Sequence, residues 1–151
     1  MKLQDAIKTT RFRNEVHKAT LNVIYTAYWL KTKLSPVFKE HGITEEQFNV
    51  MRILKGKHPE AMCVRDIASR MLEKNSNVPR IIDRLVVKKF VKRATSKEDK
   101  RETLITLTDK GIDNLDIVSM EVEKRSNEVI NIDETQASQL HELLESLRKI
   151  D

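Results

Sequence analysis

Basic side chains are concentrated in one part of this 151-residue chain, between Arg70 and Arg101. This stretch holds eleven Lys or Arg and four acidic residues, a net charge of +7, whereas the whole chain carries +5. A focused positive patch attracts polyanions, because each phosphate that a Lys or Arg neutralises releases condensed counterions. The stretch therefore predicts a surface that binds nucleic acid.

The sequence lacks the residue patterns that enzymes and metal sites use. Its three glycines, Gly42, Gly56 and Gly111, are too far apart to form a phosphate-binding loop. The four histidines show no metal-ligand spacing. Cys63 is the only cysteine, and beside Met62 and Val64 it is more typical of a small buried residue than of a redox sensor, which stays the alternative. We predict no catalytic residue, no metal site and no cofactor.

The composition favours one helical domain. Charged residues make up 34% of the chain, and it has only three Gly and three Pro. No apolar stretch approaches the ~20 residues that a membrane span needs. The N-terminus lacks the apolar core of a secretory signal, and one cysteine cannot form an intrachain disulfide. These features predict a cytoplasmic protein with no membrane partner.

The N-terminal part predicts three helices. Residues 16–34 are apolar on two helical faces, so we expect a second subunit to cover one of them. Ser35-Pro36 has the pattern of an N-cap and first-turn proline, which predicts a break and then a short helix that ends at Gly42. Thr44–Gln47 is a capping-box pattern, and it predicts a third helix that ends at Gly56.

The basic stretch itself begins with two short predicted helices. Residues 62–64 can form a very short strand, and residues 65–72 form a helix. A second helix begins near Ser76 or Asn77, with Pro79 in its first turn, where a missing N–H costs little. Two helices joined by a tight turn, the second rich in basic residues, predict a helix-turn-helix motif.

A β-hairpin and two long helices complete the chain. Residues 90–94 and 103–108 are rich in β-branched side chains, and the charged residues 95–102 between them predict an exposed hairpin tip. Thr108 and Asp133 are the predicted N-caps of the two C-terminal helices, the last of which carries leucines at helical spacing through Ile150.

This order of elements resembles the MarR family of bacterial winged-helix transcription regulators, from about Val16 to Ile150. Residues 99–111 are similar to the family's D-x-R…L-T-x-x-G pattern, which covers the wing and its exit. Residues 77–85 resemble the start of the family's recognition helix. Pro79 departs from it, because Thr or Ser is commoner there, and this puts one DNA hydrogen bond in doubt.

The resemblance implies a mainly α fold with a small β wing, in a single domain that spans residues 1–151. Residues 43–108 would form the winged helix-turn-helix DNA-binding lobe, and residues 1–42 and 109–151 a helical dimerisation region. It further implies a homodimer that binds a pseudo-palindromic double-stranded operator, with one recognition helix of each subunit in the major groove. A two-fold dimer would also place two copies of the basic stretch on one face.

The predicted DNA-binding residues fall in two groups. In the recognition helix, Arg80 would contact bases or phosphate and Arg84 would contact phosphate. Ser76 and Asn77 either contact DNA or serve only as N-caps. Lys88 and Lys89, just beyond, are interpreted as a solvated helix end.

The second group lies in the wing. By the resemblance, Arg101 enters the adjacent minor groove, where the negative potential is enhanced. Asp99 would hold its guanidinium or brace the wing backbone, and the alternative is a surface pair worth ~0–1 kcal/mol. Lys97 and Lys100 would make unspecific phosphate contacts.

A ligand site is a further hypothesis. By the resemblance, a small aromatic or phenolic effector would bind between the dimerisation helices and the DNA-binding lobe. The candidate lining is an aromatic and apolar set with one cation, Arg52, as carboxylate partner: Tyr25, Tyr28, Trp29, Phe48, Met51 and Arg52. The alternative is that this aromatic stripe is ordinary core.

Two functions stay open at this point. The first is a homodimeric, sequence-specific transcription regulator, most simply a repressor that a small ligand releases from DNA. The second is a winged-helix interaction module that binds DNA without sequence preference or binds an acidic protein.

Overall fold

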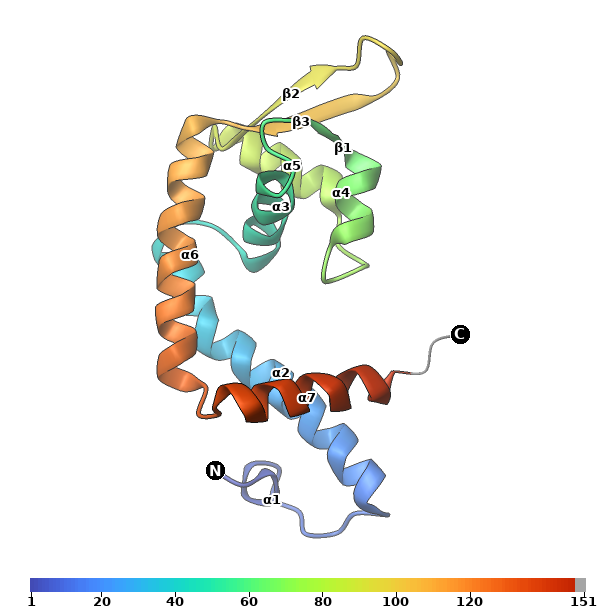
Figure 1. Cartoon of the computed structure of the whole chain (residues 1–151), viewed down its shortest axis with the longest axis vertical. Coiled ribbons are helices and arrows are strands. Elements are labelled where there is room, and N and C mark those ends of the chain that lie inside the picture. The colour runs from blue at the N-terminus through green and yellow to red at the C-terminus, as the bar shows by residue number, and fades with distance from the viewer. Residues whose placement is uncertain (149–151) are drawn as a thin grey trace.

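The computed structural model describes residues 1–148, and Figure 1 shows a winged lobe above a set of long helices. The elements in chain order are α1 (Leu3–Ala6), α2 (Glu15–Glu40), α3 (Glu45–Lys55), β1 (Met62–Cys63), α4 (Val64–Arg70), α5 (Val78–Val87), β2 (Val91–Thr95), β3 (Thr103–Leu107), α6 (Asp109–Val129) and α7 (Glu134–Leu147). The mainly helical fold with a small β wing that the sequence predicted is confirmed.

The three strands form one antiparallel sheet in the order β1-β3-β2. Ile105 of β3 lies between Met62 of β1 and Arg93 of β2. Its side chain is fully buried, so β3 anchors the sheet to the core of the lobe. The short strand that the sequence allowed at residues 62–64 is present as Met62–Cys63.

The core lies in the winged lobe, where α3, α4 and α5 pack against β3 and the upper part of α6. Its largest fully buried side chains include Met51 and Leu54 of α3, Ile67 of α4 and Leu85 of α5. By contrast, the 26-residue α2 buries only Val37 and Phe38, near its C-terminal end, and α7 buries no residue. The lower helices in Figure 1 thus have almost no core within one chain.

The predicted N-caps Thr44, Thr108 and Asp133 are confirmed. Thr44 and Gln47 form a complete capping box at α3, and Asp133 forms one with Gln136 at α7. Thr108 accepts a hydrogen bond from the Gly111 N–H at 3.0 Å and caps α6. Each cap satisfies N–H groups that the first helical turn leaves without a partner.

The predicted break at Ser35-Pro36 is wrong, because α2 continues through Pro36 to Glu40. A proline inside a helix costs about 3 kcal/mol. Val37 and Phe38 follow directly and are 8% and 5% exposed, and burying two such side chains gives about 1.5–3 kcal/mol each, which offsets that cost. The predicted end at Gly42 is confirmed: its φ of 65° is left-handed, and α2 ends at Glu40 with His41 as its C-cap.

Other boundaries differ by one or two residues. The helix predicted over 65–72 is Val64–Arg70, because Met71 turns into an extended conformation that buries its side chain. The first hairpin strand is shifted by one residue from the predicted 90–94, and the second begins at residue 103 as predicted but ends one residue before 108. The last helix ends at Leu147, and its predicted end at Ile150 lies outside the described residues.

Gly111 lies in close contact with the backbone of Phe90. A Cβ atom there would stand 2.0 Å from the carbonyl oxygen of Phe90, which is backbone and cannot rotate away. The same junction is held by Thr108, whose hydroxyl donates to the Lys89 carbonyl at 2.7 Å. The glycine thus lets the first turn of α6 lie directly against the start of β2.

We expect Gly111→Ala to lower the free energy of unfolding by about 1–3 kcal/mol, the usual cost of overpacking. Urea denaturation followed by circular dichroism measures it. Gly56→Ala is the matched control, because its new Cβ would meet nothing closer than 3.5 Å and the backbone is already helical. Equal stability of the two variants would contradict this account of the α6–β2 contact.

Candidate nucleic-acid interface

The second helix of the helix-turn-helix motif, α5, presents charged residues on its free face. Val78, Ile82 and Leu85 are buried at spacings of three and four residues, which fixes one face against the core. Arg80 and Arg84 are therefore exposed. Neither guanidinium has an ion-pair partner among residues 1–148. Both arginines are available to an external anion.

The first turn of α5 shows what Ser76 and Asn77 do in the free chain. Asn77 is the N-cap, and its Oδ1 accepts a hydrogen bond from the Arg80 N–H at 3.2 Å. The Ser76 hydroxyl is shielded from solvent and has no hydrogen-bond partner within the described residues. The N-cap interpretation of Asn77 is confirmed, and a DNA contact by either residue stays a prediction.

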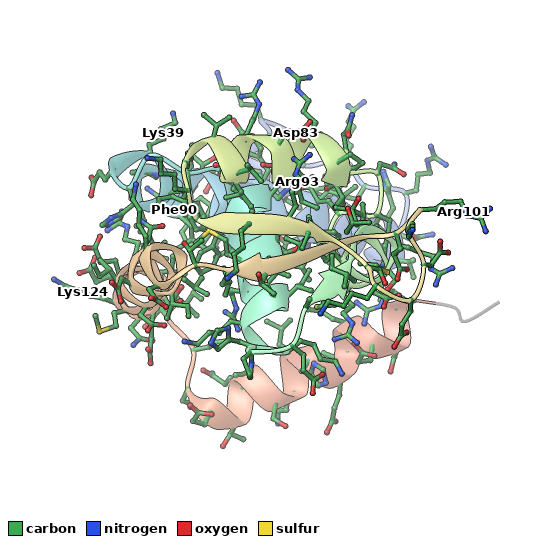
Figure 2. The ribbon with its side chains drawn as sticks, turned by 90° about the horizontal axis from the view of Figure 1, so that it is seen from above. Lys39, Asp83, Phe90, Arg93, Arg101 and Lys124 are labelled. Carbon is green, nitrogen blue, oxygen red and sulfur yellow. The ribbon has the colours of Figure 1, made fainter. Side chains whose placement is uncertain are left out.

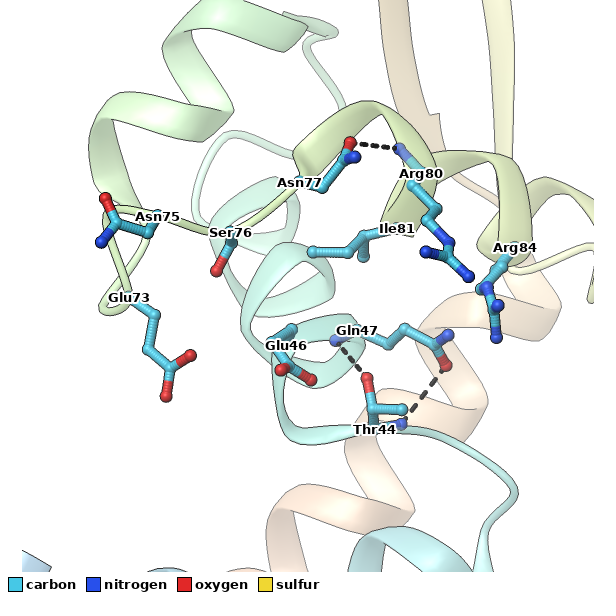
Figure 3. Close-up of a pocket in the computed structure, with 10 residues that line it drawn as sticks. All are labelled: Thr44, Glu46, Gln47, Glu73, Asn75, Ser76, Asn77, Arg80, Ile81 and Arg84. Carbon is cyan, nitrogen blue, oxygen red and sulfur yellow. Dashed lines mark hydrogen bonds between the residues drawn. The ribbon is translucent and has the colours of Figure 1, made fainter.

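A polar cavity of about 400 Å³ lies beside the N-terminal half of α5. In Figure 3, Arg80 and Arg84 extend from α5 on one side and Thr44 and Gln47 from the start of α3 on the other, and the capping-box hydrogen bonds are drawn. Glu46 and Glu73 also line the cavity. The arginines thus stand at the rim of a hollow that is open to solvent.

The hairpin tip is folded by two side chains. Ser96 is only 6% exposed, and its hydroxyl accepts hydrogen bonds from the N–H groups of Glu98 and Asp99, each at 3.3 Å. Asp99 Oδ1 accepts from the Arg101 N–H at 2.9 Å and lies 3.5 Å from the Arg101 Nε. Asp99 therefore contacts both the backbone and the guanidinium of Arg101. The sequence analysis missed Ser96, although a Ser at the start of a polar hairpin tip is a known turn former.

The wing carries its cations away from the body of the protein. The Arg101 side chain is 94% exposed, and Figure 2 shows it projecting beyond the sheet. Lys97 and Lys100 are exposed on the same tip. The structure therefore brings the wing group together at one end of the lobe and the helix group together along α5.

An ion pair ties α5 to the wing. Arg93 of β2 hydrogen-bonds the carboxylate of Asp83, and Figure 2 shows the two side chains pointing toward one another. The pair removes one negative charge from the exposed face of α5. This pair was not predictable from the sequence, because nothing in the spacing of the two residues indicates that strand and helix meet there.

Lys88 is not the solvated helix end that the sequence predicted. Its ammonium donates hydrogen bonds to the Gly42 carbonyl and, at 2.8 Å, to Oε1 of Gln47, which is itself 2% exposed. Burial lowers the pKa of Lys88, and the nearby positive charge of Arg84 lowers it further. Lys88 thus joins the end of α5 to the α2–α3 junction, while Lys89 is exposed as predicted.

Two further polar contacts involve α2, one with the lobe and one with another long helix. Lys31 of α2 forms an ion pair with Glu73 in the turn between α4 and α5, and this hydrogen bond raises the pKa of Lys31. His41, at the end of α2, lies 2.8 Å from the Glu121 carboxylate of α6. The helix-turn-helix motif is therefore in direct contact with α2.

The six predicted ligand-site residues do not gather in one place. A cavity of about 660 Å³ between α3 and α6 is lined by Phe48 and Arg52, together with Leu115, Ser119 and Val122 among others. Met51 is fully buried in the core. Tyr25, Tyr28 and Trp29 lie on α2 and do not line this cavity, and Tyr28 is 69% exposed.

Cys63 is buried in β1. Within residues 1–148, no group of three or more His, Cys, Asp or Glu side chains could hold a metal ion. In the same part of the chain, none of the helices is both long and apolar enough to span a lipid bilayer.

A helix-turn-helix motif followed by a two-stranded wing, with exposed arginines on both, defines a winged helix-turn-helix protein of the DNA-binding class. Residues 43–103 match the MarR family. The chain is 37% identical over 78 residues to the HTH-type transcriptional regulator YkoM of Bacillus subtilis, which covers 52% of this chain and 49% of that protein. Residues 43–103 are therefore a MarR-family domain, of the kind found in transcription regulators.

Solved structures of this family have the same fold. A MarR transcription factor from Planctomyces limnophilus is 28% identical, with a TM-score of 0.70 over 91% of this chain and 98% of that one. The Staphylococcus aureus MepR–DNA complex has a TM-score of 0.75 at 19% identity, over 85% of this chain and 94% of that one. The match to YkoM spans only about half of that relative.

We expect Lys88→Met to lower the free energy of unfolding by about 1 kcal/mol, because Gln47 and the Gly42 carbonyl each lose a charged donor. Thermal unfolding followed by circular dichroism measures the change. Lys89→Met removes the same charge from an exposed neighbour and should stay within about 0.5 kcal/mol of the parent chain. A larger loss for Lys89→Met than for Lys88→Met would refute the assigned contacts.

Proposed function

We propose that this protein is a homodimeric, sequence-specific DNA-binding transcription regulator that acts in the cytoplasm as a repressor. The proposal rests on Arg80 and Arg84 of α5, which are exposed and have no ion-pair partner among residues 1–148. It rests equally on Arg101 of the wing, whose side chain is 94% exposed. The MepR–DNA complex, whose fold this chain shares, supports double-stranded DNA as the partner.

The proposed contacts follow the two groups of cations. Arg80, Arg84, Ser76 and Asn77 lie along or before the start of α5, which would enter the major groove. Arg101 would enter the minor groove with its guanidinium oriented by Asp99, and Lys97 and Lys100 would contact phosphates of the backbone. Each half of a pseudo-palindromic operator would receive one such set.

A homodimer is proposed because the long helices leave large apolar side chains uncovered in a single chain. Large apolar side chains are exposed on all three of them, as a set: Val16, Ile24 and Tyr28 on α2, Ile117 and Met120 on α6, and Leu140, Leu143 and Leu147 on α7. Exposed apolar side chains in this number, on helices that have almost no core of their own, support an interface there. The dimerisation region of the proposal is residues 1–42 and 109–151, and the DNA-binding lobe is residues 43–108.

An effector site is proposed between α3 and α6. The cavity there is within the size range of small-molecule sites and is lined by apolar Phe48, Leu115 and Val122 beside the cation Arg52. The Arg52 guanidinium lies 5.9 Å from the centre of the Phe48 ring, so it can pair with the carboxylate of an aromatic acid stacked nearby. Such a ligand would favour one spacing of the two recognition helices over another.

We expect Arg101→Ala to weaken operator binding by about 1–3 kcal/mol. It should also reduce the magnitude of the slope of log affinity against log salt concentration by about one, because one phosphate contact is lost. Fluorescence anisotropy with a labelled promoter duplex at several salt concentrations measures both. Lys124→Ala, which removes an exposed cation on α6 far from the wing in Figure 2, is the control and should change neither. An unchanged affinity for Arg101→Ala would remove the wing from the proposed interface.

Competition separates this proposal from an interaction module without sequence preference. Unlabelled operator should displace the labelled duplex at much lower concentration than random duplex, because specific binding by such proteins is typically ~10³–10⁷ times tighter. Equal displacement by the two competitors would favour non-specific binding.

We expect Leu143→Glu to convert the protein into a monomer and to abolish operator binding, because it buries a charge in the proposed dimer interface. Leu143 is 70% exposed in the single chain, so the change should not disturb the lobe itself. Sedimentation velocity gives the oligomeric state. Glu142→Lys lies on the opposite face of α7 and should remain dimeric. A parent chain that sediments as a monomer would refute the homodimer.

A further inference from the structure

One side chain of α5 breaks the pattern of its helix. The apolar residues Val78, Ile82 and Leu85 are all buried, whereas Val87 is 82% exposed. Val is also among the weaker helix formers, so helix propensity does not explain why this exposed position of α5 carries a Val. Single exposed apolar residues are common on protein surfaces, so the position of Val87 decides whether it matters.

Val87 lies on the free face of α5, at the C-terminal end of the helix. At about 100° per residue, Arg80, Arg84 and Val87 fall within an arc of about 60°, opposite to the buried stripe. Along the helix axis, Val87 lies about 10 Å from Arg80, which corresponds to roughly three base pairs of DNA. The apolar side chain therefore shares one face with the arginines that we assign to the major groove.

Both edges of this face are fixed by polar contacts. On one edge Asp83 is held by Arg93 of β2, and on the other Lys88 is held by Gln47 of α3. Val87 lines a cavity of about 240 Å³ with Asp83, Arg84, Lys88 and Gln47. Asp83 and Lys88 are thus engaged in contacts within the protein, whereas Arg84 and the methyl groups of Val87 remain exposed.

We propose that Val87 contacts the C5-methyl group of a thymine in each half-site and contributes to sequence specificity. This inference rests on the proposed function. Among the groups that base pairs present in the major groove, the thymine methyl is the apolar one, and it is the natural contact for an aliphatic side chain. The surrounding arginines make a duplex, rather than an apolar protein surface, the partner that this face attracts.

The contact is tested with operator duplexes in which deoxyuridine replaces thymine, one position at a time. This change removes only the methyl group. The operator is first selected from random duplexes by the parent protein. At one symmetric position in each half-site, deoxyuridine should weaken binding of the parent by about three- to tenfold, the scale of one or two buried methyl groups.

Val87→Ala should bind the thymine operator about as weakly as the parent binds the deoxyuridine one, and it should lose the sensitivity at that position. Leu72→Ala is the matched control, because Leu72 is also 82% exposed but lies in the turn before α5. It should retain the full deoxyuridine effect. Circular dichroism confirms that each variant is folded.

The outcomes separate the inference from the proposed function. If Val87→Ala keeps the parent's full sensitivity at every position, or the parent shows none, the thymine contact is refuted although a specific operator exists. If no sequence can be selected from random duplexes, sequence-specific binding itself fails, and the thymine contact fails with it.

Discussion

The orientation of α5 is the constraint on which the interface depends. Its buried stripe fixes which face is free, but a stripe alone allows a helix to slide or rotate. Lys88 ties its C-terminal end to Gly42 and Gln47, and Asp83 ties its middle to Arg93 of the sheet. Hydrogen bonds to charged groups are about twice as strong as neutral ones, so two such contacts restrict the remaining freedom. The arginines of α5 thus stand at defined positions before any DNA arrives.

The same contacts explain why the helical region matters for DNA binding. Lys88 reaches the junction that follows α2, and Lys31 of α2 reaches Glu73 in the turn before α5. Both ends of the helix-turn-helix motif are therefore linked to one long helix that has little core of its own. Whatever covers the exposed apolar face of α2 also sets the position of this helix, and through it the position of α5.

Much of this structure was predictable from local sequence patterns. Thr44, Thr108 and Asp133 were assigned as N-caps because a cap depends on residues only three positions apart. The helix-turn-helix and the hairpin followed from periodicity and from the polar tip. The continuous α2 was not predictable from its local pattern, since Ser35-Pro36 favours a break, and only the burial of Val37 and Phe38 by distant elements overrides it.

The site was predictable in kind but not in geometry. The charge of residues 70–101 identified the basic surface, and Arg101 is exposed on the wing as that interpretation requires. The role of Lys88 was missed because its partners, Gly42 and Gln47, are more than forty residues away in the chain. The aromatic residues of α2 and α3 have similar helical spacing, yet Phe48 is buried in the lobe and Tyr28 is exposed.

The junction at Gly111 has a mechanical consequence. The Thr108 hydroxyl bonds the Lys89 carbonyl, its own N–H bonds the Phe90 carbonyl, and Gly111 lies against that same peptide group. No layer of side chains separates α6 from the base of the wing, so there is nothing compressible between them. A tilt of α6 would therefore shift the base of the hairpin, and the displacement would increase toward the arginine at its tip.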